Sequence, residues 1–170
     1  MALTKVTGEG VGTLTSGISG TDITLSGGAY LGGTGSANYL DDYEEGTWTA
    51  EIRGTTTDPS TAVTQSSARY TKIGRQVFCQ FGFSNVNTTG ASGGVRVSGL
   101  PFSAATTYAT GNVMTYVGMT LSTTSTNISP FVEGTNIAFY QSTNQAGWSE
   151  ITHNAGTGAY LYATVTYETT

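Results

Sequence analysis

The segment Leu40–Ile52 reads LDDYEEGTWTAEI and marks the point where the character of the chain changes. Four carboxylates within five residues precede Gly46, and apolar residues then occupy alternate positions at Trp48, Ala50 and Ile52. A charged turn followed by alternation with a period of two predicts a β-strand with one buried face. Because the preceding residues are rich in glycine, we expect a β-domain to begin here.

Strand-like alternation continues along the rest of the chain, with almost no helical periodicity. Segments 68–73 and 76–83 flank the dipeptide Gly74-Arg75, a pattern that predicts a β-hairpin. Further strands are expected at 94–97, 112–121, 128–133, 136–141, 148–151 and 159–167. Long loops are expected at 55–66 and 85–93. About nine short strands separated by turns predict an all-β fold, an antiparallel β-sandwich of jelly-roll type.

Cys79 is the only cysteine of the chain, so a disulfide within the chain is excluded. The period of two places it on one face of a strand with Val77, Phe81 and Phe83. We therefore expect a buried thiol with a structural role. A nucleophilic thiol needs a nearby base, and the only histidine, His153, lies in a polar, turn-rich stretch far along the chain.

Composition excludes several classes of function. Charged residues make up 10% of the chain, and the formal net charge is −5. The six Lys and Arg residues are scattered, which argues against nucleic-acid binding and against binding to anionic membranes. The sequence has no apolar stretch of about 20 residues, and Met1–Gly12 lacks the apolar core of a signal peptide. We expect a soluble protein that is made in the cytoplasm and does not insert into a membrane.

Residues 1–39 form the first of two expected units. Glycines separate short apolar pieces, none of which is long enough to build a core of its own. Such a segment is expected to bury its apolar residues against other chains, as an attachment arm or an intertwined β-shaft; a disordered leader is the alternative. The residues assigned to this attachment or oligomer interface are Val11, Leu14, Ile18, Ile23, Leu25, Tyr30 and Leu31. Residues 40–170 are expected to form the β-sandwich.

Two of the expected strands carry apolar residues on both faces. In 112–121, Met114 and Tyr116 lie opposite the set Val113, Val117, Met119 and Leu121. In 159–167, Tyr160 and Tyr162 lie opposite the set Leu161, Ala163, Val165 and Tyr167. One apolar face is enough for a monomeric sandwich. The second face predicts an oligomer interface, unless these tyrosines simply occupy an exposed surface.

The carboxylates Asp41, Asp42, Glu44 and Glu45 do not have the spacing of a calcium loop, and adjacent positions on one turn do not face each other across a cleft. We expect a solvated turn, with Asp42 or Glu45 paired to Arg53 or Arg75. No catalytic residue, metal or cofactor is predicted.

Binding chemistry is better supported than catalysis. Trp148 follows the polar loop 142–147, and Tyr108 follows the phrase Gly99–Phe102. Aromatic rings beside Asn, Gln and Ser suit sugar stacking combined with hydrogen bonds. Tyr108 and Trp148 are therefore candidate glycan contacts, with a core position as the alternative for Trp148.

Three phrases carry a resemblance to a known family: LDDYEEGTW at 40–48, RYTKIGRQV at 69–77 and GLPF at 99–102. The order and spacing of these phrases resemble the C-terminal β-domains of bacteriophage virion appendage proteins, such as tail fibres, tail spikes and decoration proteins. The match covers residues 28–102, with a weaker match at 163–169. Ala50 stands where proline is usual, and Ala68 where glycine is usual.

The resemblance implies a structural protein of a phage virion, made in the host bacterial cytoplasm. It implies a homotrimeric surface appendage, such as a small tail fibre, that contacts other tail or capsid proteins through its arm. The alternatives are a capsid decoration protein and a glycan-binding module that contacts the host surface. An enzyme is not expected, because depolymerising spikes generally need a longer β-helical body.

Overall fold

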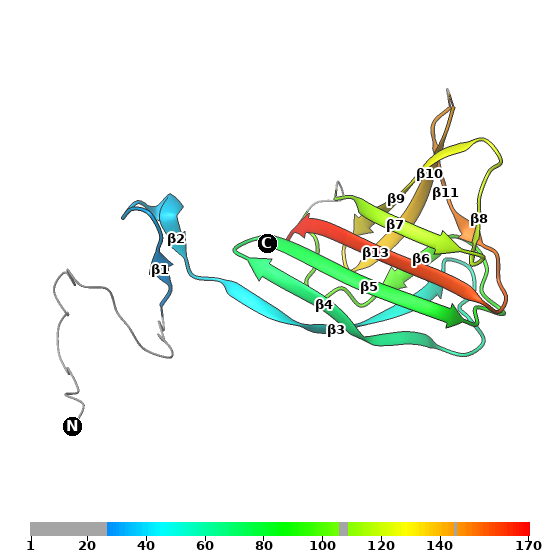
Figure 1. The fold of residues 1–170 in the computed structure, drawn as a ribbon, viewed down its shortest axis with the longest axis horizontal. Helices are drawn as coiled ribbons and strands as arrows, with labels where there is room; N and C mark the ends of the chain where they lie inside the picture. The colour runs from blue at the N-terminus through cyan, green and yellow to red at the C-terminus, as the bar shows by residue number, and fades with distance from the viewer. Residues whose placement is uncertain (1–26, 106–108, 145) are drawn as a thin grey trace.

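The computed structural model describes residues 27–105, 109–144 and 146–170, and strands dominate it (Figure 1). One antiparallel sheet contains β3 (Tyr43–Gly54), β4 (Val63–Ile73), β5 (Gln76–Val86), β6 (Val95–Ser98), β7 (Gly111–Tyr116), β9 (Ser125–Glu133), β10 (Asn136–Thr143), β11 (Trp148–Glu150) and β13 (Ala159–Glu168). Two small sheets pair β1 (Ala29–Tyr30) with β2 (Tyr39–Leu40), and β8 (Met119–Thr120) with β12 (Thr152–His153). The 3-10 helix η1 (Ser36–Asn38) is a single turn.

The large sheet folds over on itself to make two layers. Its strand order is β11-β10-β6-β3-β4-β5-β13-β7, and β9 pairs with β10. The two ends of the sheet meet where Thr110 bridges Phe131 and the Val132 amide donates to the Ala109 carbonyl at 3.1 Å. β3, β4, β5, β13 and β7 form the front layer in Figure 1, and β6, β9 and β10 pass behind them. The predicted all-β, sandwich-like fold is confirmed.

The core follows the alternation expected from the sequence. Trp48, Ala50 and Ile52 of β3 are buried, and the Trp48 ring meets Phe81 of β5 edge-on at a centroid distance of 5.7 Å. Alternate residues of β5 and β13 complete the front half of the core: Val77, Cys79, Phe81, Phe83, Leu161, Ala163, Val165 and Tyr167. Val132, Ile137 and Phe139 face them from the rear layer. The inward residues predicted for β3, β5 and β13 are confirmed.

Cys79 is buried within this core, as predicted. Its Sγ lies 4.0 Å from the hydroxyl of Tyr167, which donates a hydrogen bond to the Phe102 carbonyl at 2.9 Å. Burial raises the pKa of the Cys79 thiol to about 12, although the contact with Tyr167 acts in the opposite direction. The thiol is therefore protonated at neutral pH and serves packing.

The strand predicted at 112–121 is wrong as a single element. β7 ends at Tyr116, and Val117 takes a left-handed conformation with φ of 65°. This turn redirects the chain so that β8 pairs with β12, with Met119 opposite His153. As a result Val117 and Leu121 are exposed, whereas Met119 is buried.

The two predicted long loops are shorter than expected. β4 begins at Val63 and β5 continues to Val86, which leaves 55–62 and 87–94 as connections. These connections contact each other, since Thr57 bridges Ser92 and its hydroxyl donates to the Gly90 carbonyl at 2.8 Å. Residues 63–66 and 85–86, which the sequence predicts to lie in loops, therefore belong to β4 and β5.

The β1-β2 hairpin lies off the end of β3, apart from the two layers (Figure 1). Tyr30 packs against Tyr39 with ring centroids 4.8 Å apart. Gly28 has φ of +107°, and a Cβ there would lie 2.6 Å from the Leu40 carbonyl oxygen, so glycine is required. Because Leu40 pairs with Ala29, it belongs to the β1-β2 hairpin, and the first strand of the sandwich begins at Tyr43.

Candidate functional site

The three phrases that carry the family resemblance meet in one cluster at the end of the sandwich nearest the hairpin. Lys72 pairs with Asp42, and its Nζ lies 5.5 Å from the centre of the Phe102 ring. Tyr70 meets the same ring edge-on at 5.4 Å and donates its hydroxyl to Glu44. We call Asp42, Glu44, Gly46, Tyr70, Lys72 and Phe102 the signature cluster.

Gly46 is explained by its partner across the strands. It is registered opposite Tyr70, and a Cβ at position 46 would lie 2.7 Å from the Tyr70 ring. A tyrosine ring that covers a glycine on the adjacent strand protects the backbone and fixes the register. The signature cluster is therefore a structural joint that holds the start of β3 against β4 and residue 102.

The carboxylates of the opening segment have partners other than those expected. Asp42 pairs with Lys72, and Glu45 accepts a hydrogen bond from Tyr43. Arg53 instead pairs with Glu51 at 2.8 Å and with Asp58 at 2.7 Å. The predicted pairing of Asp42 or Glu45 with Arg53 or Arg75 is wrong. Strand register places residues 43–45 opposite residues 71–73 at the C-terminal end of β4, far from Arg53. Arg75 lies close to Asp42, since the Gly74 amide donates to the Asp42 carbonyl at 2.7 Å, but the Asp42 carboxylate pairs with Lys72 instead. The bond to Glu44 raises the pKa of Tyr70, and the bond to Arg53 lowers that of Asp58.

Trp148, the predicted glycan contact, is 77% exposed at the start of β11, so its alternative placement in the core is wrong. Tyr108, the other predicted contact, lies outside the described residues. β10 and β11 rise beyond the body of the sandwich at the top of Figure 1. Trp148 therefore stands on a projecting part of the sheet.

A hollow of about 310 Å³ lies beside Trp148 on the outer surface of β9, β10 and β11. Its lining consists of Thr110, Ser129, Pro130, Phe131, Tyr140, Ser142 and Trp148. We call it the Trp148 hollow. Register explains the assembly, since Tyr140 lies opposite Ser129 on β9 and Ser142 lies opposite Trp148 on β11.

Three aromatic rings form a row across this surface. The centroids of Phe131 and Tyr140 are 5.7 Å apart with the rings nearly perpendicular, and those of Tyr140 and Trp148 are 6.4 Å apart. The sequence pattern does not single out Phe131 or Tyr140 as binding residues. Their positions within the predicted strands 128–133 and 136–141 were the available signal, but their meeting depends on the pairing of β9, β10 and β11.

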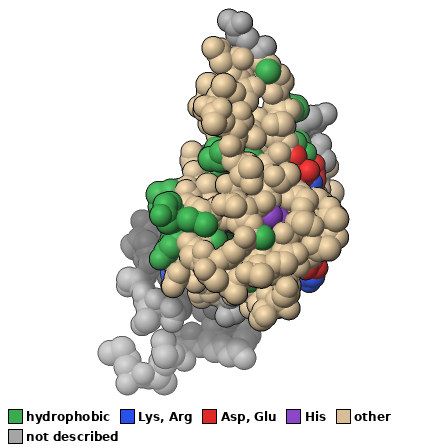
Figure 2. All heavy atoms as spheres, turned by 90° about the vertical axis from the view of Figure 1, so that its right-hand side faces the viewer, with side chains coloured by type: hydrophobic (Ala, Val, Ile, Leu, Met, Phe, Trp, Pro, Cys, Tyr) green, Lys and Arg blue, Asp and Glu red, His purple; other side chains and the backbone are tan. Residues whose placement is uncertain are grey.

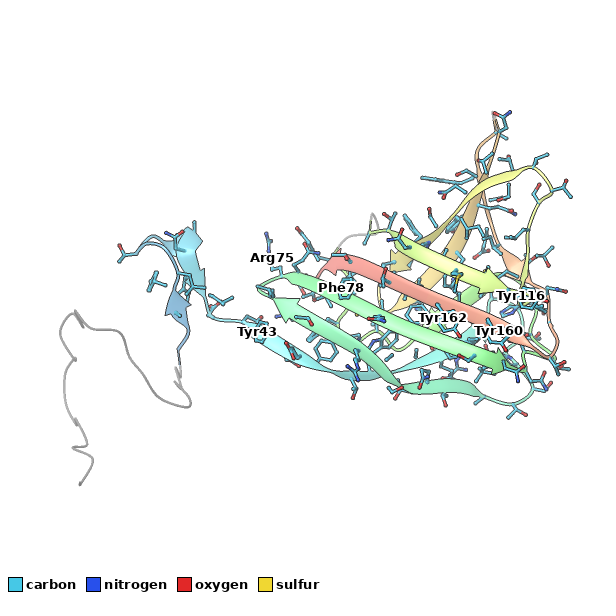
Figure 3. All side chains as sticks on the ribbon, viewed as in Figure 1. Tyr43, Arg75, Phe78, Tyr116, Tyr160 and Tyr162 are labelled. Carbon is cyan, nitrogen blue, oxygen red and sulfur yellow. The ribbon has the colours of Figure 1, made fainter. Side chains whose placement is uncertain are left out.

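A second exposed apolar surface covers β5, β13 and β7 on the front layer. Figure 2 shows hydrophobic side chains gathered at the left, and Figure 3 shows how the labelled aromatic residues lie on the strands. Met114 is 66% exposed, Tyr116 68%, Phe78 44% and Tyr162 37%. We call Phe78, Met114, Tyr116, Tyr160 and Tyr162 the outer aromatic face. The predicted outward position of Met114, Tyr116 and Tyr162 is confirmed.

Cross-strand pairs organise the outer aromatic face. Tyr162 lies between Gly82 and Met114, and Tyr160 lies opposite Tyr116 with ring centroids 6.2 Å apart. A Cβ at Gly82 would lie 2.5 Å from the Tyr162 ring, so this tyrosine covers a glycine as Tyr70 does. The next row, Gln80, Thr164 and Asn112, is polar but uncharged.

The predicted attachment residues are only partly covered by the structure. Tyr30 and Leu31 are 55% and 60% exposed in the hairpin region. Val11, Leu14, Ile18, Ile23 and Leu25 lie outside the described residues.

Within residues 27–105, 109–144 and 146–170, no group of three or more His, Cys, Asp or Glu side chains is arranged to hold a metal ion. In the same part of the chain, no helix has the length and apolar character needed to cross a membrane. No protein-family model matches the chain, and no curated protein is significantly similar to it in sequence. The relation to phage appendage proteins therefore stays a prediction.

Proposed function

We propose that this protein is a structural subunit of a bacteriophage particle. It is a homotrimeric surface appendage, of the small tail-fibre kind, that attaches through residues 1–39 and projects its β-sandwich outward. The observation that carries the proposal is the outer aromatic face, which leaves four large apolar side chains partly in water. Contiguous apolar patches on a soluble protein commonly mark contacts with other chains.

The composition of this face supports contact between subunits. Phe78, Met114 and Tyr162 lie near a polar but uncharged row of residues. Burying this face against another subunit would therefore leave few charged side chains without water. The row consists of Gln80, Thr164 and Asn112. Protein interfaces are enriched in aromatic residues and Met and depleted in Lys, Glu and Asp at their centres. A partner copy is a suitable occupant because most soluble oligomers are symmetric assemblies of one chain.

The signature cluster supports the proposed division of labour. Asp42 immediately precedes β3, and Glu44 is the second residue of that strand. Their partners, Lys72 and Tyr70 respectively, lie on the neighbouring strand β4. The residues that carry the family resemblance therefore fix the point where the chain passes from the arm to the sandwich. This arrangement suits a part whose arm is held by another protein of the particle.

Mass measurement of the full chain in solution tests the assembly. We expect a trimer, and the double variant Met114→Lys with Tyr116→Lys should dissociate it because both side chains lie on the outer aromatic face. Trp148→Lys is the matched control, since Trp148 is also largely exposed but lies in the hollow on the other layer. A wild-type monomer at micromolar concentration, with the full arm present, would contradict the trimer.

Imaging of phage particles that carry a labelled chain tests the location. Label on the tail supports a fibre, whereas label on the capsid supports the decoration alternative. Removal of residues 1–39 should abolish attachment and leave the sandwich folded. If the shortened chain still attaches, residues 1–39 are not the arm.

A further inference from the structure

We propose that the Trp148 hollow binds a neutral saccharide, with the Trp148 indole as the stacking platform and Tyr140 at the centre of the site. This inference goes beyond the proposed virion subunit, and its test does not require a trimer or a particle. It assigns a ligand class and a set of contacts from the geometry of three adjacent strands.

The exposed indole is the first argument. Trp148 is 77% exposed, whereas Trp48 is 6% exposed in the core. One face of a pyranose ring carries mainly C–H bonds, and its area is close to that of an aromatic ring. Stacking removes both surfaces from water while the sugar hydroxyls stay solvated at the rim, and Trp keeps an N–H donor for them.

The row of rings gives the site more than one apolar wall. The Tyr140 and Trp148 rings are tilted by 51° at a centroid distance of 6.4 Å, and Phe131 meets Tyr140 at 81°. All three rings line the same hollow, so together they form a concave surface. A ligand placed on Trp148 therefore also contacts Tyr140.

Hydroxyl groups complete the site. Ser129, Ser142 and Thr110 line the hollow, and each hydroxyl both donates and accepts hydrogen bonds. Ring hydroxyls of a sugar need partners of this dual kind. No Lys, Arg, Asp or Glu is among the described residues that line the hollow. The lining therefore offers no cation to a uronate, sulfate or phosphate, and the net charge of −5 repels such groups. Glu150, opposite Tyr140 on β11, is paired with Arg96, so this nearby guanidinium is already occupied by a carboxylate.

The size of the hollow favours a small ligand over a folded partner. Its volume of about 310 Å³ lies at the lower end of the range for small-molecule sites, roughly 300–1,000 Å³. That space suits about one or two sugar rings of a longer glycan. A second copy of the chain is the competing occupant, and the outer aromatic face offers such a copy a broader apolar surface.

The supporting strands hold the site in shape. Tyr140 and Ser142 lie on β10, which is paired with β9 along one edge and with β11 along this part of the other. Side chains that lie on a strand paired on both edges are held more precisely than those on loops. Tyr140 and Ser142 are therefore in place before a ligand arrives, which lowers the entropic cost of binding.

Tryptophan fluorescence of the full chain provides the test, because Trp148 is exposed while Trp48 is buried. The probes are methyl β-glucoside, methyl α-galactoside, maltotetraose, cellotetraose, chitotriose and polygalacturonate. We expect at least one neutral probe to change the emission saturably and to protect Trp148 from acrylamide. For a single ring the expected dissociation constant is on the order of 1 mM.

Variants separate this site from unspecific binding. Trp148→Ala and Tyr140→Ala should each weaken binding roughly tenfold or more, as measured by saturation-transfer NMR so that loss of the fluorophore does not matter. Tyr43→Ala is the matched control, because Tyr43 is 57% exposed in β3 and does not line the hollow. Circular dichroism checks that each variant is folded.

Four results would overturn the proposal. One is the absence of binding to every neutral probe at about 20 mM, roughly twenty times the expected dissociation constant. Another is binding that the Trp148→Ala and Tyr140→Ala variants retain in full, which would place the sugar elsewhere. The third is protection of Trp148 that rises with protein concentration in the absence of sugar, which would make the hollow a contact between copies. Tighter binding of polygalacturonate than of any neutral probe would contradict the ligand class.

Discussion

The two tryptophans of this protein lie in regions that differ sharply in burial, one in the core and one on the outer surface. Trp48 is 6% exposed in β3, meets Phe81 edge-on and donates its indole N–H to the Arg69 carbonyl at 3.3 Å. Trp148 is 77% exposed in β11, and its neighbour Ser149 is exposed as well. Trp48 begins an apolar alternation with Ala50 and Ile52, whereas the alternate position after Trp148 is Glu150, and only Trp48 has a partner layer in front of it. Trp48 is buried because the other layer of the sandwich packs against its ring. Trp148 has no such layer, so its ring remains available to a ligand.

The largest expected difference between the two regions is in stability. Trp48→Ala should lower the free energy of unfolding by about 3–5 kcal/mol, because it opens a cavity beside Phe81. Trp148→Ala should change it by about 0.5 kcal/mol or less, since a solvated side chain is removed. Chemical denaturation followed by circular dichroism at one protein concentration measures both. Similar losses in the two variants would show that the Trp148 hollow belongs to the folding core.

A smaller contrast separates Phe102 of the signature cluster from Phe131 of the Trp148 hollow. Phe102 packs against the core, lies at 5.4 Å from the Tyr70 ring and covers Lys72, so Phe102→Ala should cost about 2–3 kcal/mol. Phe131 contacts Tyr140 on the outer surface, and Phe131→Ala should cost about 1 kcal/mol. The midpoint of thermal unfolding gives the ranking. The reverse order would mean that the signature cluster is not a joint.

Two glycines sharpen the comparison further. Gly46→Ala forces a Cβ against the Tyr70 ring and should cost about 1–2 kcal/mol. A Cβ at Gly147, next to Trp148, meets nothing within 4 Å, so Gly147→Ala should be close to neutral. Denaturant midpoints distinguish the two. In the double variant Gly46→Ala with Tyr70→Ala the cost of the first change should shrink, because the ring that it strikes is gone.

The smallest expected effect concerns pH. The hydrogen bond to Glu44 raises the pKa of Tyr70 above its ordinary value of 10.0. This contribution to stability is therefore complete below pH 10 and is lost as pH rises through the higher pKa of the folded state. Wild-type protein and Tyr70→Phe should differ in unfolding midpoint at pH 8 and converge at strongly alkaline pH. A difference that widens with pH would contradict the bond to Glu44.

The sequence predicted the fold class well because alternation reports burial directly. Trp48, Ala50 and Ile52, together with the alternating residues of 77–83 and 161–167, needed only a period of two and a polar turn to be assigned. The hairpin at Gly74-Arg75 was predicted for the same reason, since turn chemistry is local. Local signals of this kind are enough to place about half of the core.

Contacts that depend on strand register could not be predicted from the sequence. The pairing of Asp42 with Lys72 joins residues 30 positions apart, and it follows from the alignment of β3 with β4. Tyr140 reaches Trp148 only because β10 pairs with β11 as well as with β9. The left-handed turn at Val117 also left no signal, because valine is an unusual residue for that conformation.

The direction of β3 has a mechanical consequence for a part that is held at one end. The chain enters the sandwich at Tyr43, and β3 is paired with β4 from Tyr43–Ile73 to Ile52–Val63. If residues 1–39 are held by another protein, a pull on them runs along the length of β3, so it loads these backbone hydrogen bonds in shear and shares the force among them. Peeling would instead break them one at a time. If a ligand at the far end resists the pull, the longest strand of the sheet carries the tension between the two ends of the molecule.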